Sequence, residues 1–163
     1  MRDLFQKDIF NLLQNWDIMT VKLTDLLEGV YLQKDWNKVF INTKTGQIVT
    51  VLKKYFDADS EIDPDSISDR IERAQALTAK RVKDSDNFVQ IPDITGDEQK
   101  QILIGFITEL TGSKPDPQLS IDELKKIISN EAKTDLWYTY HLSRIKEKVM
   151  NWAFDNKIEV KNL

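Results

Sequence analysis

The spacing of apolar and polar positions along the chain predicts a protein that is mostly helical. Residues 1–18 carry apolar side chains at helical intervals, which predicts an amphipathic helix with one apolar stripe. The stripe consists of Phe5, Ile9, Leu12, Leu13 and Trp16. Two further helices are marked at their starts by capping boxes, in which a Thr or Ser precedes a Glu by three residues, at Thr95 and at Ser120.

Three more helices follow from spacing and capping signals. Thr24 is the expected N-cap of a helix that ends near Leu32, and Thr134 is the expected N-cap of a long helix that ends near Asp155. A helix over about residues 66–80 is predicted from an apolar stripe that is expected to face the core. This stripe comprises Ile67, Ile71, Ala74 and Leu77 or Thr78.

Short β-branched and aromatic runs predict a small sheet. Residues 39–41 and 48–51 form an expected β-hairpin, in which Gly46 can adopt the positive φ of the turn. Short strands are also expected just before Pro92 and around residues 158–160. The predicted fold class is therefore α+β, mostly helical, packed around a small antiparallel sheet that contains a β-hairpin.

Length and apolar content fit one folded unit. The chain has 163 residues, of which 40% are hydrophobic, enough to bury a core of ordinary size. We expect a single α+β domain over residues 19–163. Residues 1–18 are expected to be an added amphipathic helix that either packs on this domain or docks a partner.

Composition narrows the classes of function. The chain has no cysteine, which excludes disulfides and thiolate chemistry and suits a reducing cytoplasm. The formal net charge is -4, so no basic field for nucleic acid covers the whole surface. No segment approaches the ~20 apolar residues that a spanning helix needs, and the polar N-terminus is unlike a signal peptide. We therefore expect a cytoplasmic protein without membrane association.

Residue types with catalytic or ligand-binding chemistry are sparse. His141 is the only histidine, so a zinc site with several His or Cys ligands is not expected. We interpret His141 as a partly exposed helix residue rather than a general base. The five glycines are too scattered for a phosphate-binding loop, so no cofactor is indicated. Asp93 and Asp97 suggest a carboxylate-based hydrolase only weakly, because acids at such positions are typical of a helix N-terminus.

An acidic segment runs from Asp57 to Asp65. Its alternating acids resemble a calcium-binding loop, but the sixth position is Ile62 instead of Gly and the twelfth is Ser68 instead of Glu. No metal is therefore expected here, and the simplest interpretation is a solvated loop. The functional alternative is that the loop docks on a basic groove of a partner. The residues assigned to such docking are Asp59, Glu61, Asp63 and Asp65.

The last predicted helix begins with an aromatic cluster. Tyr138 belongs to its apolar stripe and is expected in the core. Trp137 and Tyr140 project away from this stripe in a helical projection, and Arg144 lies one turn further on. Aromatic side chains beside an arginine often anchor protein interfaces and also stack on bases, so Trp137, Tyr140 and Arg144 are candidate partner-binding residues. The alternative is that a neighbouring helix covers the two aromatic rings.

Four segments also share an order and a spacing over about residues 20–160. They read VKLTDLLEGVYLQ, VFINTKTGQIV, FVQIPDI and LWYTYHLSRIKEKVMNWAFDNKIEV. In series they resemble an uncharacterised bacterial protein family, number 0158 of the UPF series. Members tend to carry a Gly-rich segment with Arg and Phe before the Trp-Tyr pair, which residues 125–135 lack. Met19 resembles the usual start of the family, which implies that residues 1–18 are an addition. The resemblance implies no activity.

These observations predict a small cytoplasmic protein-binding regulator or inhibitor without catalytic activity and without a cofactor. One alternative is a nucleic-acid-associated protein that uses Lys148 together with the aromatic cluster and Arg144. Another is an acidic nucleic-acid mimic, in a phage or defence context, that blocks a nucleic-acid-binding partner.

Overall fold

The computed structural model describes residues 19–58 and 62–161. The predicted helix over residues 1–18, and Asp59 and Glu61 of the acidic segment, lie outside the described residues.

The predicted fold class is confirmed. The described residues form six α-helices, a small antiparallel sheet of three strands and a two-stranded parallel sheet. In chain order the elements are β1 (Thr20–Lys22), α2 (Leu23–Leu32), β2 (Asn37–Asn42), β3 (Ile48–Leu52), α3 (Lys53–Phe56), the 3-10 turn η1 (Pro64–Ser66), α4 (Arg70–Lys83), β4 (Phe88–Gln90), α5 (Gly96–Thr111), α6 (Ile121–Asn130), α7 (Thr134–Asp155) and β5 (Glu159–Lys161).

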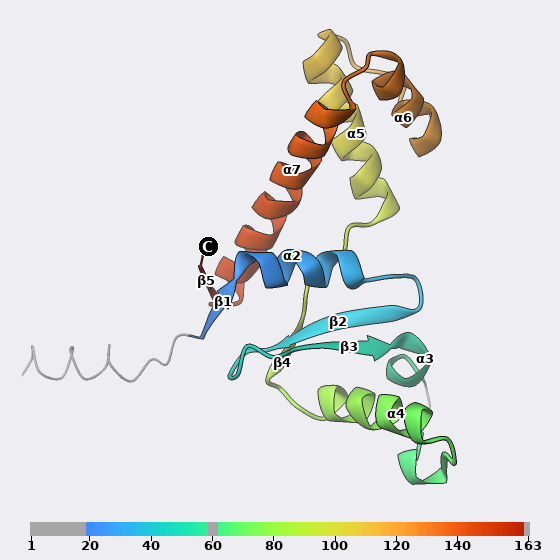
Figure 1. The fold of residues 1–163 in the computed structure, drawn as a ribbon, viewed down its shortest axis with the longest axis vertical. Coiled ribbons are helices and arrows are strands. Elements are labelled where there is room, and N and C mark those ends of the chain that lie inside the picture. Colours follow the sequence, from blue (N-terminus) through green and yellow to red (C-terminus); the bar gives the residue numbers. More distant parts are fainter. Residues whose placement is uncertain (1–18, 59–61, 162–163) are drawn as a thin grey trace, which may run out of the picture.

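The antiparallel sheet is covered by a helix on each face. Its strand order is β3-β2-β4, and α2 and α4 lie on opposite sides of it (Figure 1). Strand β2 is buried on both faces, because Val39 and Ile41 join the core beneath α2 while Phe40 joins the core beneath α3 and α4. The hairpin between β2 and β3 is confirmed, and Gly46 has the predicted positive φ of 73°.

Helix α7 joins two separate hydrophobic cores. Its first half packs with α5 and α6, and its second half packs beside α2 and the sheet (Figure 1). The chain then closes on itself, because β5 pairs with β1 in parallel, Val21 opposite Val160. A short strand was predicted around residues 158–160, but its parallel pairing with β1 was not.

The predicted core stripe of the helix before β4 is wrong. Helix α4 buries Ala76, Ala79 and Val82, whereas Ile71 is 71% exposed and Leu77 is 49% exposed. Small side chains let α4 approach the sheet closely, and this tertiary contact decides which face is buried. The helix also begins later than expected, at Arg70. Asp69 caps it by accepting a hydrogen bond from the Glu72 N–H.

The expected placement of the aromatic side chains on α7 is also wrong. Trp137 is 8% exposed and belongs to the core with α5 and α6, whereas Tyr138 is 65% exposed. The helical projection assumed that α7 packs against the same neighbouring elements along its whole length. Because α7 has one set of neighbours in its first half and another in its second, its buried face rotates from Trp137 towards Ala153.

Two of the predicted helix starts differ by one or two residues. The N-caps of α2 and α7 are Lys22 and Lys133, and neither makes a side-chain capping bond, so Thr24 and Thr134 are not caps. Strand β1 runs directly into α2, which leaves no loop residue free to cap it. Both capping boxes, at Thr95 and at Ser120, are confirmed.

One buried amide holds the end of α2 to the sheet. Gln33 is 8% exposed, and its side-chain Nε2 donates to the carbonyl oxygens of Ile91 and Pro92, each at 2.8 Å. Its Oε1 accepts from the Gln90 side chain at 3.1 Å and from the Val39 N–H at 3.4 Å. Every polar atom of the amide is thus used, which makes its burial tolerable.

Gln33→Glu should therefore destabilise the fold by about 2–4 kcal/mol at neutral pH, because a carboxylate would face two carbonyl oxygens. Burial raises the pKa of the new carboxyl in the folded state, so the loss should shrink as the pH falls towards 4, where the protonated acid again donates a hydrogen bond. Urea unfolding at both pH values measures this. Gln101→Glu, on the exposed surface of α5, is the matched control. A loss for Gln33→Glu that does not depend on pH would contradict the account.

Candidate functional site

The aromatic residues assigned to partner binding lie between helices. The ring of Trp137 lies 5.6 Å from that of Phe106 and 5.0 Å from that of His141, centroid to centroid. The ring of Tyr140 lies 5.2 Å from that of Phe106. Tyr140 also explains a glycine inside α5, because a Cβ at Gly105 would lie 2.9 Å from the tyrosine hydroxyl oxygen. Helix α5 thus packs against both aromatic rings, and Trp137 is buried while Tyr140 is half-buried.

The cations of the same region are engaged within the molecule. Arg144 donates to Glu147 at 3.2 Å and to the Tyr140 hydroxyl oxygen at 3.3 Å. Lys148 donates to the Asp93 carbonyl oxygen at 2.6 Å and forms an ion pair with Glu98. With Trp137 buried, Tyr140, Arg144 and Lys148 do not form a flat stacking platform for bases.

The described part of the acidic segment has a structural role. Asp63 caps the 3-10 turn by accepting a hydrogen bond from the Asp65 N–H at 3.0 Å. The structure thus gives Asp63 a local role and places Asp65 beside it on the exposed surface. Among residues 19–58 and 62–161, no three His, Cys, Asp or Glu side chains are grouped so that they could hold a metal ion.

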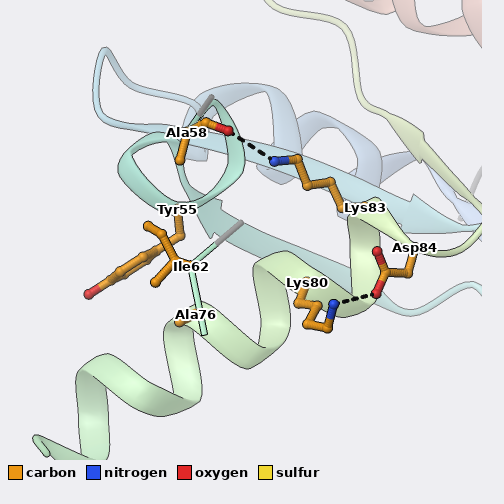
Figure 2. Close-up of a pocket in the computed structure, with 7 residues that line it drawn as sticks. All are labelled: Tyr55, Ala58, Ile62, Ala76, Lys80, Lys83 and Asp84. Atoms are coloured by element: carbon orange, nitrogen blue, oxygen red, sulfur yellow. Dashed lines mark hydrogen bonds and ion pairs between the residues drawn. The ribbon is translucent and has the colours of Figure 1, made fainter. Parts of the chain in front are cut away.

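A hollow of about 330 Å³ lies between α3, the chain that follows it, and α4 (Figure 2). Lys83 crosses its rim and donates to the Ala58 carbonyl oxygen at 3.4 Å, while Lys80 lies 3.2 Å from the Asp84 carboxylate. Ala58 and Ile62, which line this hollow, flank residues 59–61 in the sequence, which the structure does not describe, and we assign no site to the hollow.

His141 borders a second hollow, of about 370 Å³, between α2, α7 and the start of α5. Its Nε2 lies 2.9 Å from the Gln99 side-chain oxygen, and its ring packs on Trp137. Burial, with a smaller contribution from the positive charge of Lys125, lowers the pKa of His141 below its ordinary value. These contacts hold the imidazole as a neutral part of the packing between α5 and α7.

The outer edge of β3 is unpaired within the part of the chain that the structure describes. In the described residues β3 pairs with β2 alone, so one side of the strand has no partner strand. The Asn42 N–H bonds to the Gln47 carbonyl and the Lys53 N–H bonds to the Trp36 carbonyl, which fixes the alternation of the ladder. It follows that Ile48 and Thr50 direct their backbone N–H and C=O groups outward, away from β2.

A hollow lies along this edge on the side of α4. It has a volume of about 740 Å³ and is lined by Thr50, Asp69, Arg70, Ile71, Ala74, Gln75 and Thr78. Thr50 belongs to the middle of β3, so the hollow reaches the open edge of the strand. Its apolar wall is Ile71 and Ala74, part of the stripe that the sequence placed in the core and the structure leaves exposed.

A smaller hollow lies along the same edge on the side of α2. It has a volume of about 290 Å³ and is lined by Asp25, Glu28, Gly29, Leu32, Gly46 and Ile48. Leu32 is 45% exposed. The open edge of β3 therefore has a hollow above it and another below it, so that a strand added there would point alternate side chains into each. This edge, with its two hollows, is the candidate functional site.

Sequence reasoning missed this site. The order of strands in a sheet is set by long-range packing, and nothing in the residues of β3 marks it as an edge. The one related signal was the apolar stripe on α4, whose residues Ile71 and Ala74 the structure leaves exposed beside this edge.

Comparison of the chain with protein-family models, with curated proteins and with solved structures finds no match. The resemblance to the bacterial family therefore stays a prediction. No helix within residues 19–58 and 62–161 is both long enough and apolar enough to cross a membrane.

His141 should titrate below the ordinary histidine value of 6.5. Because its pKa is depressed in the folded state, the unfolded chain binds the proton more readily, so the free energy of unfolding should fall as the pH drops through this range. His141→Gln should flatten that slope. The single imidazole makes the NMR titration unambiguous, and a pKa at or above 6.5 would contradict the placement.

Proposed function

We propose that this protein is a protein-binding regulator that captures an extended segment of its partner by adding it as a strand to β3. The observation that supports the proposal is the open edge of β3 between two hollows. Main-chain hydrogen bonds to an edge strand supply affinity, and pockets for alternate side chains supply selectivity. No catalytic group is needed for such an activity, and we assign none.

The strand has the features of an edge that accepts another strand. It spans five residues, IVTVL, without the Pro, Lys or bulge that edge strands use to prevent pairing. The opposite edge is different, because β4 has only three residues and is followed closely by Pro92. The Gln90 side chain is also tied to Gln33 at that edge. These contrasts favour β3 over β4.

The apolar wall beside the edge supports the same proposal. Ile71 is 71% exposed on α4, and burying such a side chain contributes about 1.5–3 kcal/mol. Ile71 and Ala74 are both exposed and line the same hollow, so they form a small apolar surface beside the unpaired strand, as interaction sites do. The cysteine-free composition fits action in the reducing cytoplasm, which we include in the proposal.

The nucleic-acid alternatives have less support. A binding surface for bases needs exposed rings, and Trp137 is 8% exposed. A mimic built on the acidic segment would depend on Asp59 and Glu61, which lie outside the described residues.

Thr50→Pro should abolish peptide capture. It removes an outward N–H but no bond of the β2–β3 ladder, so the fold should persist, as proline is tolerated at strand edges. Selection from a random ten-residue peptide library on the full chain should enrich sequences with alternating apolar positions. These peptides should not bind Thr50→Pro, while Thr50→Ala, which keeps the N–H, should bind them.

A second variant tests the same proposal in case Thr50→Pro does not fold. Ile71→Asp alters only an exposed α4 side chain and should weaken capture at least tenfold without changing the melting temperature. If no peptide is enriched, or if Thr50→Pro and Ile71→Asp bind the enriched peptides as well as the natural chain does, the proposed function is wrong.

A further inference from the structure

The two hollows beside β3 differ in charge. On the α2 side both charged residues, Asp25 and Glu28, are acidic and exposed. On the α4 side the apolar pair Ile71 and Ala74 forms a wall, and the two charges, Asp69 and Arg70, have opposite signs at its end. The edge thus presents a negative surface to one face of an added strand and an apolar, net-neutral surface to the other.

Because side chains alternate between the two faces of a strand, this difference in charge predicts a sequence pattern for the captured segment. Residues i, i+2 and i+4 of an added strand lie on one face of the sheet, and the residues between them lie on the other. From this we infer that the captured segment alternates Lys or Arg, facing α2, with branched or aromatic apolar residues, facing α4. The inference deepens the proposed function and rests on it.

Leu32 makes the α2 side suitable for long basic side chains. It borders the same hollow as the two acids and is 45% exposed. The methylene stem of a lysine or arginine can cover such an apolar side chain while its charged head reaches Asp25 or Glu28. The hollow on this side, about 290 Å³, is also the smaller of the two, which suits a stem that lies along the surface.

A second copy of this chain is disfavoured as the occupant. If two β3 strands paired antiparallel across a two-fold axis, both α2 helices would lie on the same face of the joined sheet. Asp25 and Glu28 of one copy would then approach those of the other, and like charges at an interface oppose association. A basic segment of another protein gains from the same charges.

The charge pattern should set selectivity more than affinity. Exposed ion pairs contribute little singly and are screened by salt, so two of them should change the dissociation constant by roughly tenfold at low ionic strength. The two acids should also speed association with a basic segment.

Three ten-residue peptides test the inference, measured by fluorescence anisotropy on the full chain. They alternate Lys with Val, Glu with Val, and Ser with Val. The Lys peptide should bind roughly tenfold more tightly than the Ser peptide and the Glu peptide most weakly, with differences that shrink in high salt. The double variant Asp25→Lys/Glu28→Lys should reverse the order of the Lys and Glu peptides. The matched control is Glu131→Lys/Asp135→Lys, at the junction of α6 and α7, far from β3 (Figure 1). This variant should leave the order of the peptides unchanged.

The outcomes separate the inference from the proposed function. If the three peptides bind equally and Thr50→Pro abolishes all three, strand capture is correct and the charge assignment is wrong. If none of them binds and the peptide library also yields nothing, the proposed function itself fails. If the Lys peptide binds the Thr50→Pro variant with the same affinity as the natural chain, it binds at another place through its positive charge. That result would also overturn the inference.

Discussion

The constraint on which this structure depends is that every backbone N–H and C=O group needs a partner, and that a helix cannot supply one to a strand. Helices α2 and α4 cover the two faces of the sheet and bury its side chains, but both satisfy their hydrogen bonds internally. The described sheet has only three strands, so the outward groups of Ile48 and Thr50 are left for solvent or for another chain. A hollow lies on each side of the outer edge of β3, one lined by residues of α4 and the other by residues of α2.

The rest of the fold keeps this edge in place. Helix α7 spans both cores, so the arm of α5 and α6 and the layer of α2 are held by one rigid element (Figure 1). At the other end of α2, the Gln33 amide binds the chain at Ile91 and Pro92 and thereby fixes the helix over the sheet. Gly29 allows the close contact that this requires, because a Cβ there would lie 2.6 Å from Cδ1 of Ile91, which is fully buried. The position of α2 in turn sets where Asp25 and Glu28 lie relative to β3.

Local signals in the sequence predicted local structure well. The capping boxes at Thr95 and Ser120, the turn at Gly46 and the hairpin were confirmed, because each depends on residues within a few positions of one another. The single caps expected at Thr24 and Thr134 were wrong, since α2 and α7 begin one or two residues earlier. The buried faces of α4 and α7 were predicted wrongly, since they are chosen by distant partners: small residues beneath α4, and two successive neighbours along α7. The partner-binding assignment of Trp137 depended on that same projection, and its burial removes it from the surface. The edge of β3 could not be predicted, because strand order is a property of the whole sheet.

The most direct test of the account is amide hydrogen exchange of the two outward-facing residues of β3. With the alternating Lys and Val peptide bound, the N–H groups of Ile48 and Thr50 should become strongly protected, while those of Val49 and Val51, already bonded to β2, should change little. Protection that appears instead on α5 to α7, with Ile48 and Thr50 exchanging as fast as in the unbound protein, would contradict the claim that β3 is the binding edge.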